Sequence, residues 1–391
     1  MVSSLEKSLF KLIVFFAISY QVSHAYAQAG AISCLAQPIN YVRVAIIQDT
    51  NSTSLKIRGT YQILDSSGKQ ILFEGRNLKT TVTTYKDGIL IGGEIFSQEK
   101  IFVKTKNGES IVINGRRFKG EIQFIKKENL NLSVINYIYL EDYIKGILYH
   151  EVSHYWPDEA LKAQAIVCRT YALYQMQENK NKDYDVTSDV YSQVYGGQTS
   201  ERYRTTKAVE QTKGLILIYQ GKILPTYFHA TCAGHTEDAS RLWNIDLEPL
   251  KGVACLFCKD SPHFRWNYVL AQDKVREKLA DAGYNIEKIE DLRITDRDSS
   301  GRITTLKIIN GKEELEISAK NFREIIGPNI IRSTNFNVTV MDGDIIFQGL
   351  GWGHGVGLCQ WGAYFMAKQG YKYEEILKHY YPGAKISLNA E

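Results

Sequence analysis

The sequence contains no low-complexity linker and no internal repeat, and it lacks a large excess of either charge. The formal net charge is +4, and it falls to +3 without residues 1–27, because that segment holds two lysines and one glutamate. So small an excess gives no argument for nucleic acid as a partner, although it does not oppose a polyanionic cell envelope. With 44% apolar residues, the chain can bury a large core as two domains or as one elaborated domain.

Long apolar runs are also scarce, and the run near the N-terminus is too short to favour a membrane-spanning helix. Lys7 and Lys11 mark the basic end of this run, LFKLIVFFAISY, and Ala25-Tyr26-Ala27 fits a small-x-small cleavage site before Gln28. These features predict a secretory signal over residues 1–27, with an uncleaved N-terminal anchor as the alternative. We therefore expect an exported protein of the periplasm or cell envelope, where disulfides can form.

Residues 38–135 alternate apolar and polar positions between turns that contain glycine and asparagine, which is typical of strands. The predicted strands are YVRVAIIQD, SLKIRGTYQIL, GILIGGEIF, KIFVKTKNG and the segment ESIVINGRRFKGEIQFI. Helical and strand patterns mix in the rest of the chain. We predict an α+β fold in which a β-rich N-terminal region, residues 28–135, precedes a mixed catalytic core, residues 136–391.

Two helical patterns, separated by a break at Trp156-Pro157, lie between Tyr139 and Tyr174. The first carries one stripe at i, i+4, i+7, i+8 and i+11, made of Leu140, Ile144, Ile147, Leu148 and Glu151. A carboxyl group on an apolar stripe loses solvation, which raises its pKa and suits it to act as a general acid near neutral pH. The ordinary alternative is a carboxyl group at the end of a helix that bends back to water.

The same stretch matches the zinc metalloprotease signature H-E-x-x-H, from His150 through Glu151 to His154. Two histidines four residues apart on one helix can bind zinc, with the glutamate as the base. The predicted helix break at Trp156-Pro157 follows His154 directly and leaves little room for the helical turn that would carry this second ligand. We therefore favour a different role for Glu151.

Two short pairs of candidate metal ligands follow, His229-x-x-Cys232 and Cys255-x-x-Cys258. Together they predict a four-ligand zinc site. A disulfide among the three cysteines competes with this interpretation in an exported protein, and both stay open. Cys168 lies in the second helical pattern and is expected to be a small buried hydrophobe.

Five glycines alternate with other residues around His354, in the segment GLGWGHGVGLCQWGAYFMAKQGYKYEEILKHYYPG. Such a density of glycine lets the backbone approach a ligand closely and adopt positive φ. Gln360 and Trp361 are expected to open the helix that follows. The alternative is a tight structural loop around a packed histidine.

The chain resembles the SpoIID/LytB family of bacterial cell-wall proteins. Two segments carry the resemblance, YLEDYIKGILYHEVSHYWPDEALKAQAIVCRTYAL and GLGWGHGVGLCQWGAYFMAKQGYKYEEILKHYYPGAKI. Between them, SQVYGG, TKGLILIYQGKILPTYFHATCAGHTE and SSGRITTLKI fit in order, so that the match covers roughly residues 130–385. The family pattern has the glutamate at position 151 but is not marked by histidine on either side, so the metalloprotease match is accidental on this interpretation.

The resemblance implies a lytic transglycosylase that cleaves the MurNAc-β-1,4-GlcNAc bond of peptidoglycan strands and leaves a 1,6-anhydro-MurNAc end. Glu151 would protonate the leaving oxygen and then, as carboxylate, help to remove the proton of the sugar's own 6-hydroxyl. Such chemistry does not need the second carboxylate of ordinary glycoside hydrolysis. The implied substrate-binding residues are Lys162, Gln164, Arg169, Gln193, Tyr195, Tyr227, His229, His354 and Gln360. Lysine or arginine could hold a carboxylate of the glycan.

The resemblance leaves the cofactor, partner and biological role open. No cofactor is required, and a structural zinc remains a hypothesis, since the segment Tyr184–Gly196, where some relatives bind zinc, contains neither cysteine nor histidine. The expected partners are peptidoglycan strands, stripped of peptides or not, and an N-acetylmuramoyl-L-alanine amidase. The alternative function is a non-catalytic amidase enhancer, and the process served is sporulation or division.

Overall fold

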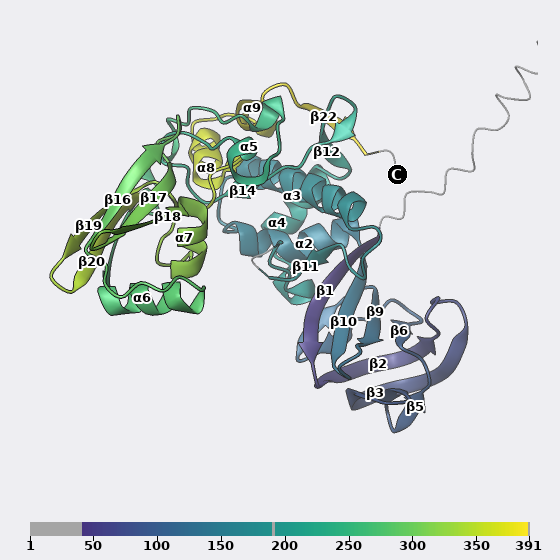
Figure 1. The fold of residues 1–391 in the computed structure, drawn as a ribbon. Helices are drawn as coiled ribbons and strands as arrows, with labels where there is room; N and C mark the ends of the chain where they lie inside the picture. The colour runs from purple at the N-terminus through teal and green to yellow at the C-terminus, as the bar shows by residue number, and fades with distance from the viewer. Residues whose placement is uncertain (1–40, 190–191, 390–391) are drawn as a thin grey trace, which may run out of the picture. The chain divides into compact units, whose positions relative to one another are not determined.

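The fold is that of a computed structural model, which describes residues 41–189 and 192–389. The predicted signal segment, residues 1–27, lies outside this range. The described residues belong to one structural unit, whose path is drawn in Figure 1. Across those residues, no helix has both the length and the apolar character needed to cross a bilayer.

The N-terminal part is one large sheet of eleven strands, which confirms the predicted β-rich region. Its central order is β11-β1-β10-β9-β6-β2-β3-β4-β5, and the pairs are antiparallel except β1 with β11. The strands are β1 (Tyr41–Thr50), β2 (Ser52–Leu64), β3 (Ile71–Tyr85), β4 (Gly88–Ile91), β5 (Glu94–Phe96), β6 (Lys100–Thr105), β7 (Ile111–Ile113), β8 (Arg116–Phe118), β9 (Glu121–Lys126), β10 (Leu132–Tyr139) and β11 (Val186–Thr187).

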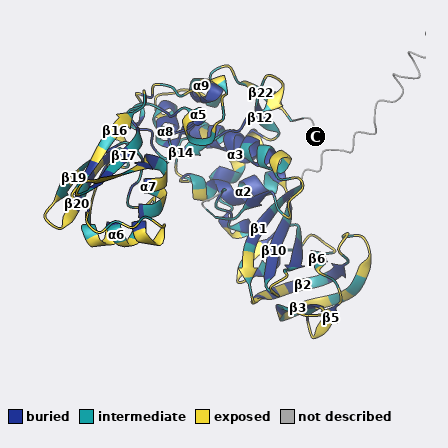
Figure 2. Cartoon of the chain, in the orientation of Figure 1, coloured by how far each residue is buried: buried dark blue, intermediate teal, exposed yellow. Residues whose placement is uncertain are grey.

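Alternation places one face of this sheet in the core. In β2, Thr53, Leu55 and Ile57 are buried while the residues between them are exposed. β10 is buried along nearly its whole length, as its dark blue colour in Figure 2 shows, whereas β1 has four buried residues among its ten. The predicted strands are present, whereas β3, β10 and β11 were not predicted.

The chain passes from β10 directly into α2 (Leu140–Glu151), and Tyr139 is the residue before the helix. Its apolar stripe is buried as predicted, and the helix packs against α3 (Asp158–Glu178). α3 begins one residue after Pro157, so that this proline precedes the helix and does not lie in its first turn. The helix-break-helix prediction is thereby confirmed.

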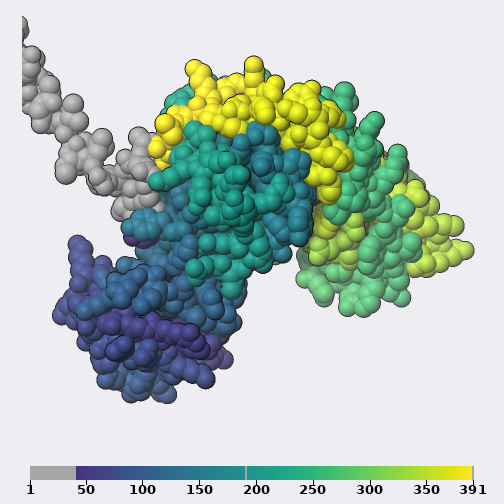
Figure 3. All heavy atoms as spheres, turned by 180° about the vertical axis from the view of Figure 1, so that it is seen from behind, coloured from purple at the N-terminus to yellow at the C-terminus, as the bar shows by residue number. Residues whose placement is uncertain are grey.

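The segments after α3 bring the end of the chain back to the middle. Figure 3 shows C-terminal residues, in yellow, lying against the teal residues from the middle of the sequence, and β22 pairs with β12 in a sheet of order β13-β12-β22. A second pair joins β14 to β21 in parallel, with His229 opposite Cys359. The elements are α4 (Tyr203–Gln211), β12 (Leu215–Tyr219), β13 (Lys222–Ile223), β14 (Phe228–His229), α5 (Ala239–Trp243), β21 (Leu358–Cys359), α8 (Gln360–Lys368), α9 (Tyr373–Tyr380) and β22 (Lys385–Leu388).

Between α5 and β21 the chain builds two three-stranded sheets with a core of their own. Their orders are β15-β20-β19 and β16-β17-β18, and α6 and α7 pack with them. The elements are β15 (Arg265–Ala271), α6 (Gln272–Asp281), β16 (Asp291–Arg297), β17 (Ile303–Asn310), β18 (Glu313–Ser318), α7 (Ala319–Ile326), β19 (Phe336–Met341) and β20 (Asp344–Leu350). The structure as a whole is α+β, as predicted, while the division at residue 135 stays a prediction.

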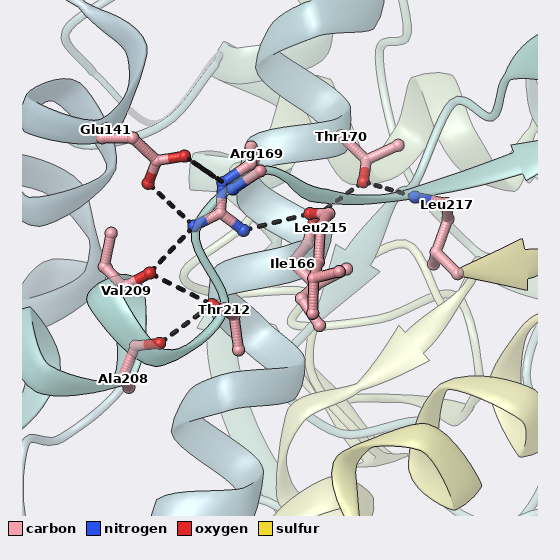
Figure 4. Close-up of polar contacts among 10 residues, drawn as sticks. Glu141, Ile166, Arg169, Thr170, Ala208, Val209, Thr212, Leu215 and Leu217 are labelled. Carbon is pink, nitrogen blue, oxygen red and sulfur yellow. Dashed lines mark hydrogen bonds and ion pairs between the residues drawn. The ribbon is translucent and has the colours of Figure 1, made fainter. Parts of the chain in front are cut away.

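A buried arginine ties the helices to the sheet β13-β12-β22 (Figure 4). Arg169 of α3 is fully buried, and its Nε and Nη2 donate to the two carboxylate oxygens of Glu141 at 2.8 and 2.9 Å. Its remaining hydrogen bonds go to the carbonyl oxygens of Leu215 (3.1 Å) and Val209 (3.2 Å). One guanidinium thus connects α2, α3, α4 and β12, and its charge is compensated where it is buried.

We expect the substitution Arg169→Met to lower the free energy of unfolding by about 3 kcal/mol, because Glu141 loses its buried ion-pair partner and keeps only the hydrogen bond from the Gly214 N–H. The matched control is Lys145→Met, since Lys145 pairs with the exposed Glu210 and such a surface pair contributes at most about 1 kcal/mol. Urea unfolding of both variants gives the comparison. Equal losses for the two variants would contradict this role of Arg169.

Candidate active site

Glu151 is the last residue of α2 and is half-buried at the end of the apolar stripe. Burial raises the pKa of its carboxyl group to about 7, and a hydrogen bond donated by the Val194 backbone N–H to Oε1, at 3.1 Å, acts in the opposite direction. A glutamate with this pKa is protonated in an appreciable fraction of molecules at neutral pH. It can therefore donate a proton to a bound molecule.

The carboxyl group faces a groove of about 760 Å³ that collects residues from α2, α3, β14, α5, α8 and the glycine-rich segment. Among the described residues that line it, Glu151 is the one carboxyl group, and no lysine or arginine is present. The lining residues are His150, Glu151, Tyr171, Gln175, Ser192, Val194, Tyr227, Phe228, His229, Ala230, Trp243, Trp352, Gly353, His354 and Gln360.

Aromatic rings form much of the wall of this groove. Tyr227 packs on Trp243 with ring centroids 4.4 Å apart, and Tyr171 meets Tyr227 edge to face at 6.0 Å. Burial, and then the charge of Glu151, raise the pKa of Tyr171 to about 12, so this phenol stays neutral. Flat apolar rings beside hydroxyl groups suit a ligand that has both apolar faces and polar edges.

Two histidines of the groove are held neutral by burial, and both are hydrogen-bonded to the backbone of Val356. The Val356 N–H donates to Nδ1 of His354 at 3.1 Å, and Nδ1 of His229 donates to the Val356 carbonyl, also at 3.1 Å. Burial, followed by the charge of Arg323, lowers the pKa of His354 to about 3. Burial and the neighbouring His354 lower the pKa of His229 as well.

The hydrogen bond to Val356 fixes the tautomer of His229. Since a carbonyl oxygen only accepts, Nδ1 of His229 carries the proton and Nε2 presents a lone pair. Nε2 is buried and finds no hydrogen-bond partner among the described residues. His229 is therefore a hydrogen-bond acceptor available to a ligand hydroxyl, and not a proton donor at neutral pH.

Gln360 at the start of α8 connects this wall to the residue that carries the acid. Its Nε2 donates to the backbone carbonyl of Glu151 at 3.1 Å. That carbonyl lies at the C-terminus of α2, where helix carbonyls have no partner within the helix. The contact therefore fixes the end of α2 to α8 across 209 positions of sequence.

The glycine-rich segment has positive φ angles and packs closely against His229 and Tyr227. Gly353 and Gly357 have φ of +107° and +70°, in the region that side chains avoid. A Cβ at Gly353 would lie 2.8 Å from Cβ of His229, and one at Gly357 would lie 2.0 Å from the carbonyl oxygen of Tyr227. These two glycines let the segment pack directly against β14.

The structure brings four of the predicted substrate-binding residues, Tyr227, His229, His354 and Gln360, together with Glu151 in the groove. Three others are buried outside the lining. Tyr195 donates to Asn136 at 2.7 Å, Gln193 accepts from Tyr143 at 3.1 Å, and Gln164 contacts Sγ of Cys168 at 3.3 Å.

Two predicted cations also lie outside the lining of the groove. Lys162 pairs with Glu159 at 2.8 Å, and Arg169 is occupied by Glu141. Trp243 and Trp352 also line the groove and were not predicted as site residues. Trp352 stands inside the glycine-rich segment, which was a usable signal, whereas nothing in the sequence around Trp243 marked it.

The two histidines of the H-E-x-x-H match do not share a helix, because α2 ends at Glu151 and His154 lies beyond it. His150 instead contacts Ser200, with Nε2 2.6 Å from Oγ. Among the described residues, the one group of His, Cys or carboxylate side chains that could hold a metal lies elsewhere. The structure thus gives no support to a metalloprotease site.

That group consists of four buried cysteines and corrects the predicted ligand set. Cys232, Cys255 and Cys258 lie together as expected, but Cys359 completes the set and His229 does not belong to it. The reason is the β14–β21 pair, which sets Cys359 beside His229 while the imidazole bonds to Val356 in the groove. Each of the four is a free cysteine, as is Cys168, which is buried as predicted.

Comparison with known proteins gives two family models and several relatives. The model described as Stage II sporulation protein matches residues 128–219, and one described as Domain of unknown function (DUF8618) matches residues 256–357. An uncharacterised protein of Brachyspira hyodysenteriae is 35% identical over 349 residues, which cover 89% of this chain and 93% of that protein. Stage II sporulation protein D of Bacillus amyloliquefaciens is 32% identical over 280 residues, covering 66% and 76%. The amidase enhancer of Bacillus subtilis is 28% identical over 292 residues, covering 62% and 40%.

The raised pKa of Glu151 predicts a pH-dependent effect of Glu151→Gln on stability. A carboxyl group whose pKa rises on folding from 4.5 to about 7 stabilises the fold below pH 4.5, and that contribution is lost as the pH rises to 7. Glutamine has no proton to lose. We expect the variant to gain about 2–3 kcal/mol relative to the wild type between about pH 5 and about pH 8. Urea unfolding at both pH values measures this gain, and a difference that does not change with pH would contradict it.

Proposed function

The chain belongs to the SpoIID family of stage II sporulation proteins, and on that premise we propose that it is a peptidoglycan lytic transglycosylase with Glu151 as its acid. The substrate would be a glycan strand of the cell wall, cut between MurNAc and GlcNAc. The observation that carries this proposal is a single carboxyl group, of pKa about 7, in a groove walled by aromatic rings.

The proposed first step is proton transfer from Glu151 to the glycosidic oxygen as the C1–O bond breaks. The bonding electron pair stays with the leaving oxygen, which departs as the GlcNAc 4-hydroxyl. Positive charge develops at C1 of MurNAc, and the new carboxylate lies beside it. The hydrogen bond from the Val194 N–H stabilises this carboxylate, because it favours the charged form.

In the second step the 6-hydroxyl oxygen of the same MurNAc attacks C1, and its proton passes to the carboxylate of Glu151. The bond formed is C1–O6, so that the product is the 1,6-anhydro sugar and the acid is restored. No water enters the reaction. One residue acts as acid and then as base, in agreement with its pKa near neutrality.

The absence of a second carboxyl group from the described lining supports this route over hydrolysis. Hydrolysing glycosidases use two carboxyl groups, one as acid and the other as nucleophile or as base for water. Intramolecular attack needs one. A histidine paired with a carboxylate could also act as the second base. Among the described residues, however, neither His229 nor His354 is hydrogen-bonded to a carboxylate, and Nδ1 of each is bonded to the backbone of Val356.

Binding would rest on stacking and hydrogen bonds, because no lysine or arginine lines the described groove. Trp243 and Tyr227 offer ring faces, and Nε2 of His229 offers an acceptor for a sugar hydroxyl. The two cations predicted to hold a carboxylate, Lys162 and Arg169, are already paired within the protein with Glu159 and Glu141.

A second candidate function follows from the relative named amidase enhancer. On that alternative the groove would bind wall polymer or an amidase without cutting glycan. The raised pKa of Glu151 argues against this alternative. A carboxyl group with a raised pKa destabilises the fold at neutral pH, and a protein that only binds its ligand gains nothing from such a group.

The test is mass spectrometry of muropeptides released from purified peptidoglycan, both intact and stripped of peptides by an amidase. We expect products that end in 1,6-anhydro-MurNAc, and we expect Glu151→Gln to lower their rate of release about a thousandfold, since the amide cannot donate the proton. The matched control is Glu210→Gln, because Glu210 is exposed on α4 and pairs with Lys145 outside the groove.

Two outcomes would contradict the proposal. Reducing MurNAc ends would mean that water attacks C1 and that the enzyme is a hydrolase. No release by the wild type, together with wall or amidase binding that survives Glu151→Gln, would favour the amidase-enhancer alternative.

A further inference from the structure

Four cysteines from three separate segments meet behind the groove, and we call them the cysteine cluster. Cys232 follows β14, Cys359 ends β21, and Cys255 and Cys258 lie in the connection that leads toward β15. All four are at most 1% exposed. The cluster therefore lies inside the core that α8 and α9 share with the β14–β21 pair.

The spacing of the sulfur atoms fits a tetrahedral metal site. All four Sγ atoms lie within 4.8 Å of one another, and those of Cys232 and Cys258 are 3.5 Å apart. Four thiolates at the usual zinc–sulfur bond length of about 2.3 Å would be separated by about 3.8 Å along each edge of the tetrahedron. A disulfide needs about 2.05 Å between two sulfurs and gives no reason for four to converge.

Donors around the cluster point at the sulfur atoms. The backbone N–H groups of Cys232 and Gly362 both donate to Sγ of Cys359, each at 3.3 Å. The hydroxyl of Tyr380 lies 3.1 Å from Sγ of Cys255. Thiolate ligands of metals accept such bonds from the residues that surround the site, and these bonds orient them.

A buried positive charge lies next to the cluster. Arg302 is 1% exposed, and its Nη2 donates to the carbonyl of Cys232 at 3.0 Å. A zinc ion with four thiolates carries a net charge of −2, so a neighbouring guanidinium lowers the cost of burying it. Cys168, by contrast, is a buried cysteine outside the cluster, whose Sγ accepts a hydrogen bond from Gln164 and whose backbone carbonyl accepts one from Gln193.

We propose that Cys232, Cys255, Cys258 and Cys359 bind one zinc ion as a closed structural site. The four protein ligands complete a tetrahedron, which leaves no position for water or substrate. The tetrahedral set of four sulfurs suits zinc or iron, and we assign zinc because a purely structural site needs no redox chemistry. The proposal does not depend on the transglycosylase function.

The site would fix one wall of the groove. Cys359 is in register with His229 across the β14–β21 pair, and the next residue, Gln360, holds the backbone of Glu151. A metal that joins Cys359 to Cys232 therefore locks both strands where they meet the groove. The residues from Cys232 to Cys258 would be closed into a loop, and such a link stabilises the fold by restricting the unfolded chain.

The test measures metal in the purified full-length chain without an affinity tag. We expect about one zinc per chain in the wild type and in Cys168→Ser, and less than about a tenth of that in the double variant Cys255→Ser/Cys258→Ser. Cobalt supplied in place of zinc gives a second readout. It should give the intense visible absorption of tetrahedral thiolate coordination in the wild type, which does not depend on whether the double variant folds.

Three results would overturn the proposal. One is zinc retained by the double variant at the level of the wild type. Another is iron, and not zinc, in the purified wild type. The third is metal-free wild type whose peptide map shows the four cysteines joined in disulfides.

Discussion

The burial of one carboxyl group at the end of α2 is the constraint on which the site depends. An ionised Glu151 would lose hydration in this position, and a single backbone hydrogen bond from Val194 does not compensate for the loss, so the pKa rises to about 7. With this pKa, Glu151 makes the fold less stable at neutral pH and is protonated there in an appreciable fraction of molecules, as the proposed acid requires. Such an exchange of stability for function is typical of active sites.

Two buried polar clusters hold the elements that create this environment. On one side, Arg169 joins α2 and α3 to α4 and β12, so the helix that ends in Glu151 cannot shift independently. On the other, the cysteine cluster lies behind β14, β21 and the start of α8, whose Gln360 reaches the Glu151 backbone. Both clusters thus tie together elements that line the groove, and the proposed proton transfer requires donor and acceptor to be held at a fixed distance.

Much of the site could be predicted from the sequence, because its strongest signals are local. The helical stripe of α2, the break before α3 and the glycine-rich segment each occupy one short stretch, and each is found where the pattern placed it. β10 was missed for a physical reason. It is buried on both faces, so its residues do not alternate between apolar and polar.

The remaining features depend on contacts between distant segments. Cys359 lies 101 positions from Cys258, and only the β14–β21 register places it in the cluster instead of His229. The sequence pattern places Lys162 and Arg169 on one face of a helix. It cannot show that α3 is buried on nearly every side, or that Glu159 and Glu141 are the partners of these two cations. Trp243 enters the groove through the fold of α5, with no pattern in its own segment.

The most direct test of this account is the pKa of Glu151 itself, followed through the carboxyl carbon signal in a ¹³C NMR titration. Glu151→Gln identifies the signal by removing it. We expect a midpoint near 7, as burial dictates. A midpoint near the ordinary value of 4.5 would mean that the carboxyl group is solvated and charged at neutral pH, and the proposed acid would then have no proton to give.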